Sequence, residues 1–366
     1  RKHLDDELAL NPQDCEAQLL RSSLTTQNAS QNHIDELRAM LAQSPISPLA
    51  TTQLNYALAK EYEDLQDYRH SAEHLTCAAK TRRAHMQYDV SADVQTLATL
   101  RTLYKPAFFA QTGAACSSDT PIFILGLPRT GSTLVERILS QHPDIESAGE
   151  LNHFAKVMTQ MIRIANPGIP LSKVAMVQRS SALNFKELGE RYVHCLTDER
   201  PNARFVIDKL PLNSLYTGLI HKALPQAKII YIQRHPLASC YAMYKQLFTH
   251  GYPFSYDLDE LGKYYIAHHT MMTQCQQALG SAMFTLQYEA LVDDFEPSVA
   301  ALANYCGVDL QPQMLAFASN TAASTTASAA QVRQGLYRSS RDQWRNFETL
   351  LAPLKQQLIN AGIPCA

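Results

Sequence analysis

Apolar residues recur at two different spacings along the chain, and the change of spacing divides it. Up to about residue 105 the spacing is helical, most clearly at 54–80, where it predicts two amphipathic helices joined by a turn near 65–68. From Pro121 onward, short apolar runs alternate with helical patterns, which favours a parallel sheet wrapped by helices. The runs are 122–127, 204–209, 228–234 and 283–288.

The pattern predicts two domains of different class. We expect an all-α helical domain at 1–110, a polar linker at 111–120 and an α/β domain at 121–366. The segment 54–80 resembles a tetratricopeptide repeat in which Gln66 replaces the usual turn glycine. A generic helical bundle is the alternative. Because such stacks need about three repeats and the chain opens without a methionine, we expect further repeats upstream of a truncated N-terminus.

Composition narrows the function classes. The 366 residues carry a net charge of -2, which argues against a generally basic nucleic-acid binder, and no apolar run reaches the length of a membrane span. The eight cysteines are scattered without a C-x-x-C pair. That spacing predicts reduced thiols in a cytoplasmic protein and makes a zinc site unfavourable, so we expect no metal.

The first apolar run leads into the turn Gly126-Leu-Pro-Arg-Thr-Gly131-Ser-Thr133 and then an amphipathic helix. Backbone N–H groups in a strand–loop–helix arrangement of this kind cradle anions. The nucleotide-triphosphate version reads G-x-x-x-x-G-K-[ST], whereas here Ser132 takes the lysine position, which disfavours a nucleotide kinase. The anion-binding candidates of this loop are Arg129, Thr130, Gly131, Ser132 and Thr133.

Polar residues follow the apolar runs, at the edge where ligands of parallel sheets bind. They are Arg129, Lys209, Arg234 and Tyr288, and three of them are cations suited to a polyanion. Ser239 stands five residues after Arg234, in the first turn of the next predicted helix. An arginine fork and a helix-start hydroxyl can share one phosphate. Taken alone, this pair is better interpreted as a surface arginine and a serine that stabilises the start of the helix.

Together, "PRTGST" and the later "R-x-x-x-x-S" resemble the sulfotransferases that use 3′-phosphoadenosine 5′-phosphosulfate (PAPS). The resemblance implies that the first loop holds the 5′-phosphosulfate and that Arg234 and Ser239 hold the 3′-phosphate. "SQHPDIESAGEL" and the repeat region look most like bacterial tetratricopeptide-repeat sulfotransferases, related in their catalytic part to protein-tyrosine sulfotransferases. The implied fold is a P-loop-type parallel sheet with flanking helices (the sulfotransferase fold) behind an all-α tetratricopeptide-like domain.

The resemblance also implies catalytic roles. Glu150 would be the base for the acceptor proton, and Lys209 would contact the oxygen that bridges sulfur and phosphorus, with Arg129 as the third catalytic residue. His153, which could share a helix face with Glu150, is the second candidate for the base. The alternatives are a helix-capping role for Glu150 and an ion pair of Lys209 with Asp208.

The remaining cofactor contacts are expected in the C-terminal third. Tyr288 resembles a family tyrosine near the cofactor phosphate, although a core tyrosine fits nearly as well. Residues 326–344 resemble the family's C-terminal cofactor loop, with Ser328, Arg333 and Tyr337 as contacts for the 3′-phosphate or adenine.

These observations predict a PAPS-dependent O-sulfotransferase that acts without a metal. The first candidate for the acceptor is tyrosine in a peptide or protein, because helical repeats bind extended peptides. A small phenol, an alcohol or a saccharide stays open, as does the oligomeric state. The rival from another class is a repeat-based protein-binding module with an inactive catalytic domain.

Overall fold

The computed structural model describes residues 2–111, 113–198, 200, 202–317 and 339–365. By internal contacts the chain forms two compact units. The helical unit comprises Arg1–Val90, Pro236–Tyr264 and Asp342–Ala366; the sheet unit comprises Ser91–His235 and Tyr265–Arg341. This division interleaves the two units along the sequence, whereas the sequence pattern suggested consecutive domains at 1–110 and 121–366. The predicted domain bounds at 1–110 and 121–366 stay a prediction.

In the described part of the chain, five parallel strands form one sheet with the order β2-β3-β1-β4-β5. The four strands expected from the apolar runs are present, and β2 is an additional edge strand. It has three residues and only its first is buried, so it lacked an apolar run that the sequence could have revealed. The strands are β1 (Pro121–Gly126), β2 (Ile145–Ser147), β3 (Phe205–Asp208), β4 (Lys228–Gln233) and β5 (Met283–Gln287).

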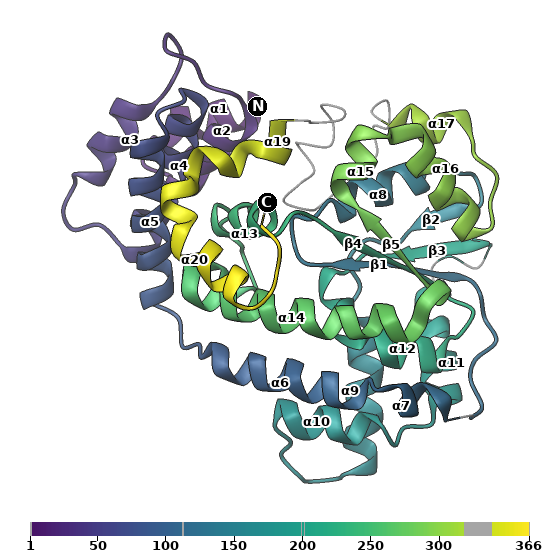
Figure 1. Cartoon of the computed structure of the whole chain (residues 1–366). Coiled ribbons are helices and arrows are strands. Elements are labelled where there is room, and N and C mark those ends of the chain that lie inside the picture. Colours follow the sequence, from purple (N-terminus) through teal and green to yellow (C-terminus); the bar gives the residue numbers. More distant parts are fainter. Residues whose placement is uncertain (1, 112, 199, 201, 318–338, 366) are drawn as a thin grey trace. The chain divides into compact units, whose positions relative to one another are not determined.

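The central strand β1 is buried along its whole length, because helices cover both faces of the sheet. On one face, Ile122 and Ile124 pack with apolar residues of α8 (Ser132–Leu139), α15 (Tyr288–Asp293) and α16 (Phe295–Cys306). On the other face, Phe123 stacks on Tyr192 with ring centroids 5.2 Å apart. The α/β class expected from the alternating pattern is therefore confirmed (Figure 1).

Further helices complete the sheet unit. Tyr192 belongs to α11, and the second face is also covered by α9, by α12 and by the later part of α14. Their bounds, with those of the remaining helices of this unit, are α6 (Val90–Leu103), α7 (Pro106–Ala110), α9 (His153–Ala165), α10 (Lys173–Ser180), α11 (Phe185–Thr197), η1 (Pro211–Tyr216), α12 (Thr217–Ala223), α14 (Leu258–Leu279), η3 (Gly280–Ala282), α17 (Pro312–Leu315) and α19 (Ser339–Asp342).

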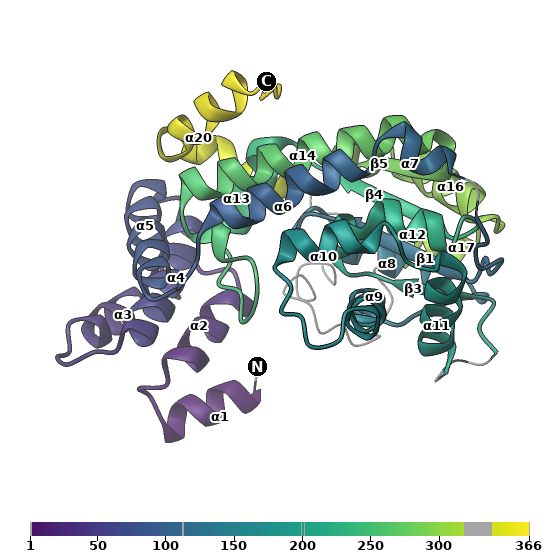
Figure 2. The same cartoon turned by 90° about the horizontal axis from the view of Figure 1, so that it is seen from below.

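The helical unit contains the predicted pair of helices, α4 (Pro48–Asp64) and α5 (Tyr68–Ala84), which lie side by side in both views (Figures 1 and 2). Gln66 in the turn has φ 62°, a left-handed conformation that glycine adopts most easily. The two helices and their turn are confirmed, and the tetratricopeptide assignment stays a prediction. The other helices of this unit are α1 (Lys2–Leu10), α2 (Cys15–Leu24), α3 (Ile34–Leu41), α13 (Pro236–Tyr244), η2 (Pro253–Tyr256), η5 (Gln343–Phe347) and α20 (Glu348–Asn360).

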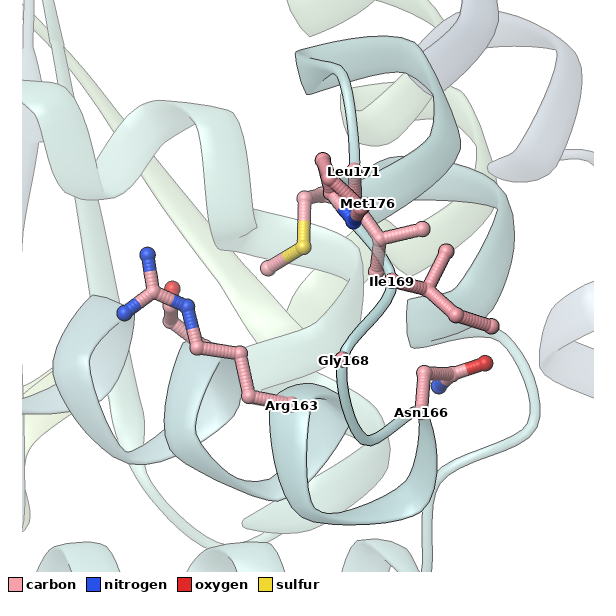
Figure 3. A pocket seen from close by; sticks show the side chains of 8 residues that line it. Arg163, Asn166, Gly168, Ile169, Leu171 and Met176 are labelled. Carbon is pink, nitrogen blue, oxygen red and sulfur yellow. The ribbon is translucent and has the colours of Figure 1, made fainter.

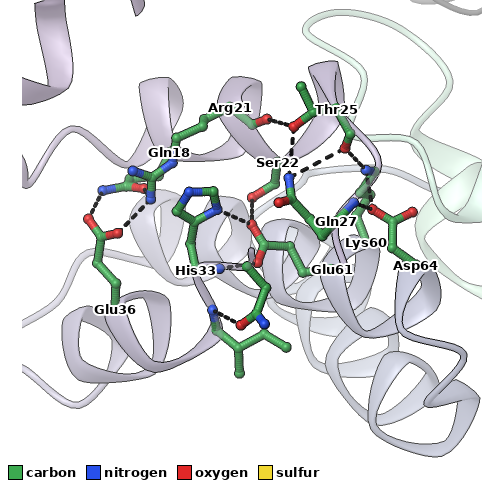
Figure 4. A network of polar contacts seen from close by, with 12 residues as sticks. Gln18, Arg21, Ser22, Thr25, Gln27, His33, Glu36, Lys60, Glu61 and Asp64 are labelled. Carbon is green, nitrogen blue, oxygen red and sulfur yellow. Dashed lines mark hydrogen bonds and ion pairs between the residues drawn. The ribbon is translucent and has the colours of Figure 1, made fainter. Parts of the chain in front are cut away.

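A buried carboxylate joins three segments of the helical unit (Figure 4). The side chain of Glu61 on α4 is fully buried and accepts hydrogen bonds from the Ser22 hydroxyl and the His33 backbone N–H, both at 2.6 Å. The His33 ring lies 3.0 Å from the same carboxylate. A buried carboxylate needs such donors, so Glu61 fixes α2 and the start of α3 against α4.

Candidate functional site

The five strands end at one edge of the sheet, because all of them are parallel, and a polar residue follows each end. In strand order β2-β3-β1-β4-β5 these residues are Glu150, Lys209, Arg129, Arg234 and Tyr288. The carboxyl edge of a parallel sheet is where ligands bind in folds of this class. The predicted positions of Arg129, Lys209, Arg234 and Tyr288 at strand ends are confirmed, and Glu150 joins them through a strand that the sequence did not predict.

The loop between β1 and α8 has the backbone of an anion-binding turn. Gly131, immediately before α8, has φ 107°, and a Cβ there would lie 2.5 Å from the Tyr288 ring, so only glycine fits. Arg129 also adopts a positive φ of 67°. The Thr130 hydroxyl donates to the carbonyl of Leu127 at 2.8 Å and thereby closes the turn. The N-terminal amides of α8, beginning at Ser132, follow directly, and such a helix end attracts anions.

Two arginines meet at this loop. The Arg234 guanidinium donates to the backbone carbonyl of Arg129 at 2.8 Å and lies 4.9 Å from the centre of the Tyr288 ring. Burial, followed by the repulsion of Arg234, lowers the pKa of Arg129 to about 10. Burial likewise lowers the pKa of Arg234. Two partly buried guanidinium groups that repel one another are stabilised when an anion binds between them.

Lys209 and Glu150 form the central ion pair of the site. The Lys209 side chain is only 1% exposed, whereas that of Glu150 is 43% exposed. Lys209 Nζ donates to Glu150 Oε1 at 2.5 Å. The two residues are 59 positions apart in sequence and meet because β2 lies beside β3. A buried ammonium and a carboxylate that reaches solvent therefore lie together at the ligand edge.

Asp208 does not compete for Lys209. It is fully buried and accepts a hydrogen bond from the Tyr192 hydroxyl at 2.9 Å. Burial raises the pKa of Asp208 to about 7, and the Tyr192 hydrogen bond opposes the shift. The alternative in which Lys209 is engaged with its neighbour Asp208 is not the arrangement found.

The relation between Glu150 and His153 differs from the expectation. Glu150 lies in the loop before α9, whereas His153 is the first residue of that helix, whose N-cap is Asn152. The two residues therefore do not share a helix face, and Glu150 is not the capping residue. The predicted shared helix face is wrong because β2 ends at Ser147 and the loop that follows it, which contains Glu150, continues up to the start of α9.

Glu136 and Ser147 were missed by the sequence reasoning. The Glu136 side chain, on α8, is 11% exposed, and one of its oxygens lies 3.8 Å from Lys209 Nζ. It accepts a hydrogen bond from the Ser147 hydroxyl at 2.5 Å, and Ser147 Oγ in turn accepts from the Gly149 N–H at 3.1 Å. One signal could have been read: Glu136, with its neighbour Arg137, interrupts the apolar positions of the short helix STLVERIL.

The remaining predicted contacts are Ser239, Thr133 and three residues of the C-terminal segment. Ser239 belongs to α13 and to the helical unit; its hydroxyl is buried and has no hydrogen-bond partner among the described residues. Ser328, Arg333 and Tyr337 lie outside the described residues. The hydroxyl of Thr133 is buried at the start of α8.

A separate pocket of about 520 Å³ lies at the end of α9 and the start of α10 (Figure 3). It contains none of the predicted site residues, and no side chain in its lining takes a proton from an alcohol near neutral pH. Its lining consists of Thr159, Arg163, Asn166, Gly168, Ile169, Pro170, Leu171 and Met176. The cations and the carboxylate that could take part in a reaction therefore lie at the strand ends and not in this pocket.

Over the described residues, no set of three or more His, Cys, Asp or Glu side chains is placed to hold a metal ion. None of the helices in the same residues is both long and apolar enough to span a membrane. All eight cysteines are described, and each is a free thiol.

The comparison with protein families agrees with this geometry. Residues 121–312, more than half of the chain, match the model of the sulfotransferase family. The chain belongs to the sulfotransferase family. The match begins at the first residue of β1 and extends past β5, so it includes all five strand ends.

Individual relatives are distant. An uncharacterized protein of Aquifex aeolicus (strain VF5) is 27% identical over 95% of this chain and 46% of its own length. Protein-tyrosine sulfotransferase 1 of Danio rerio is 26% identical over 48% of this chain and 50% of its own length. The chain thus spans about half the length of these curated relatives. Among solved structures, the sulfotransferase domain from the Synechococcus PCC 7002 olefin synthase matches 68% of this chain and 95% of that chain, with 20% identity and a TM-score of 0.48.

Proposed function

We propose that this sulfotransferase moves a sulfuryl group from PAPS to an acceptor hydroxyl. The observation that carries the proposal is the Lys209–Glu150 pair beside the two arginines at the carboxyl edge of the sheet. A cation that neutralises a leaving phosphate and a carboxylate that takes a proton are the two groups such a transfer needs.

The residues of the β1–α8 loop fit the phosphosulfate end of PAPS. Arg129, the glycine turn and the α8 amides form a cradle of donors, and Arg234 adds a second guanidinium beside this loop. PAPS supplies the activated sulfuryl group and carries no γ-phosphate, so the absence of a lysine at Ser132 agrees with this donor. Arg234 would hold the 3′-phosphate, with Ser239 as its predicted companion.

Glu150 would take the proton from the acceptor. Its carboxylate reaches solvent, which gives an acceptor hydroxyl access to it. Lys209, released from Glu150, would donate to the bridging oxygen as its bond to sulfur breaks, so that the leaving phosphate gains negative charge next to an ammonium. Arg129 would stabilise the same charge from the loop.

We further propose tyrosine in a peptide as the acceptor, with a cytoplasmic location. The similarity to protein-tyrosine sulfotransferases supports this acceptor, as does the predicted tetratricopeptide-like character of the helical unit, because helical repeats bind extended peptides. Small phenols, alcohols and saccharides are the competing acceptors. An inactive binding module is disfavoured because Lys209 and Glu150 meet at the ligand edge.

Ligand-induced stabilisation tests the proposal. Adenosine 3′,5′-bisphosphate is expected to raise the melting temperature by several degrees at a concentration of about 100 Kd, and ATP with Mg²⁺ far less. Adenosine 5′-monophosphate, which lacks the 3′-phosphate, serves as the matched control. Equal or greater stabilisation by ATP with Mg²⁺ would contradict the proposal. The acceptor is then sought by transfer of labelled sulfate from PAPS to a tyrosine peptide, a small phenol and a saccharide.

A further inference from the structure

Lys209 lies between two carboxylates that differ in exposure. Glu150 forms the 2.5 Å hydrogen-bonded pair, while Glu136 lies 3.8 Å from the ammonium, close enough to attract it but beyond hydrogen-bonding distance. The Glu136 side chain is 11% exposed and that of Glu150 is 43% exposed. The ammonium therefore has one partner that can move into solvent and one that cannot.

The proposed reaction, on which this inference rests, requires Lys209 and Glu150 to separate. Glu150 must turn to the acceptor hydroxyl and Lys209 to the bridging oxygen. An ammonium that is 1% exposed would then lose its nearest counter-charge, which is strongly unfavourable in a buried place. Glu136 is the carboxylate that remains beside it.

Glu136 also reaches the loop that carries Glu150. Its carboxylate accepts the Ser147 hydroxyl at 2.5 Å, and Ser147 holds the Gly149 N–H, one residue before Glu150. The backbone N–H of Lys209 donates to the carbonyl of Gly149 at 2.8 Å. One buried side chain on the helix of the anion-binding loop thus lies beside Lys209 and, through Ser147, holds the loop that carries Glu150.

We propose that Glu136 is a positioning residue of the transfer reaction. Its charge holds the Lys209 ammonium in place while Glu150 serves the acceptor, and its bond to Ser147 fixes the loop of Glu150. If Glu136 had only a structural role, an uncharged oxygen that accepts from Ser147 would be sufficient. A substitution that keeps this oxygen and removes the charge therefore separates the positioning role from the structural one.

The first arm of the test uses Glu136→Gln in the full chain, because glutamine keeps an accepting oxygen and removes the charge. With PAPS and the acceptor that wild-type protein turns over fastest, kcat is expected to fall about tenfold, while KM for PAPS and the melting temperature stay close to wild type. The matched control is Glu146→Gln, which makes the same charge change at an exposed position on β2 and should leave kcat unchanged. Wild-type kcat in Glu136→Gln would overturn the proposal.

The second arm needs no turnover. In Glu136→Ala, amide hydrogen exchange over residues 147–151 should become about tenfold faster, since Ser147 loses its acceptor. Glu146→Ala should leave this exchange unchanged, and Ser147→Ala should reproduce the faster exchange if Glu136→Ala does not fold. Unchanged exchange in both Glu136→Ala and Ser147→Ala would overturn the proposal. A wild-type protein that neither binds adenosine 3′,5′-bisphosphate nor uses PAPS would instead contradict the proposed function, and the exchange result would still decide whether Glu136 positions the loop.

Discussion

Each unit contains a polar cluster built around a deeply buried charged residue, Glu61 in one and Lys209 in the other, and these two clusters differ in what surrounds that charge. In the helical unit, Glu61 is fully buried and bonded to the Ser22 hydroxyl and to His33 (Figure 4). In the sheet unit, Lys209 is buried to a similar degree, yet its closest partner, Glu150, reaches solvent.

This difference separates a structural cluster from one that can react. If a donor leaves Glu61, a buried carboxylate loses part of its hydrogen bonding with nothing to replace it. If Glu150 leaves Lys209, water or an acceptor can solvate the carboxylate, and Glu136 still attracts the ammonium. The first arrangement favours a single state, whereas the second permits two. We therefore expect substitutions in the helical cluster to change stability and those in the sheet cluster to change turnover.

The largest effect is expected for Glu150→Gln. Glutamine preserves the shape but cannot take a proton, so kcat should fall about a hundredfold or more, with little change in the affinity for PAPS or in the melting temperature. Steady-state kinetics and calorimetric binding of adenosine 3′,5′-bisphosphate measure the two quantities. His153→Ala is the companion variant and should lose much less. A reversed order would make His153 the base, and full activity in both variants would show that neither residue is.

Arg234→Ala is expected to weaken PAPS binding by about ten- to a hundredfold, because the loss of a charge-assisted hydrogen bond costs roughly 1.5–3 kcal/mol. A ligand without the 3′-phosphate should bind almost as well as before. Because Arg234 also donates to the carbonyl of Arg129, a second outcome is meaningful. Equal losses for both ligands in a calorimetric titration would show that Arg234 acts by bracing the loop.

Glu61→Gln tests the structural side of the comparison. The amide has one accepting oxygen in place of two, so at least one donor among Ser22 and His33 loses its partner, and the free energy of unfolding should fall by about 1–3 kcal/mol. Turnover per folded molecule should not change. Glu73→Gln, on the exposed face of α5 where Glu73 pairs with Arg69, should change stability by no more than about 0.5 kcal/mol. Denaturant unfolding of both variants measures the difference, and similar losses in the two would remove the contrast between buried and exposed carboxylates.

The smallest effect concerns pH. Burial raises the pKa of Asp208 to about 7, above the ordinary aspartate value, so the folded state holds a proton that the unfolded state has released. This contribution to stability is therefore complete below about pH 4 and is lost as the pH rises to about 7. Because asparagine does not titrate, Asp208→Asn should lack this decline. Between pH 5 and pH 6 its free energy of unfolding should fall by about 1 kcal/mol less than that of the wild type, as measured by denaturant unfolding at each pH. An unchanged slope would show that Asp208 keeps its ordinary pKa.

Local patterns were sufficient for much of the fold. The buried runs at β1, β3 and β4 are recognisable because strands covered on both faces are largely apolar, and the partly buried edge strand β5 still has an apolar start. The α4–α5 pair follows from helical spacing, and the residues after the four strands could be placed at one edge because parallel strands end together. The glycine at 131 could be read from the turn itself.

The tertiary structure decided which side chains meet. The three-residue strand β2 has no apolar run of its own and exists only through pairing with β3, and that pairing brings Glu150 to Lys209. Packing of α8 beside the same strands turns Glu136 from an ordinary helix residue into a second partner of the lysine. By itself the sequence determined the strands, the turn and the residue types at the sheet edge, since these depend on neighbours a few positions apart. Which carboxylate faces which cation depends on contacts between distant segments, and only the folded chain fixes those.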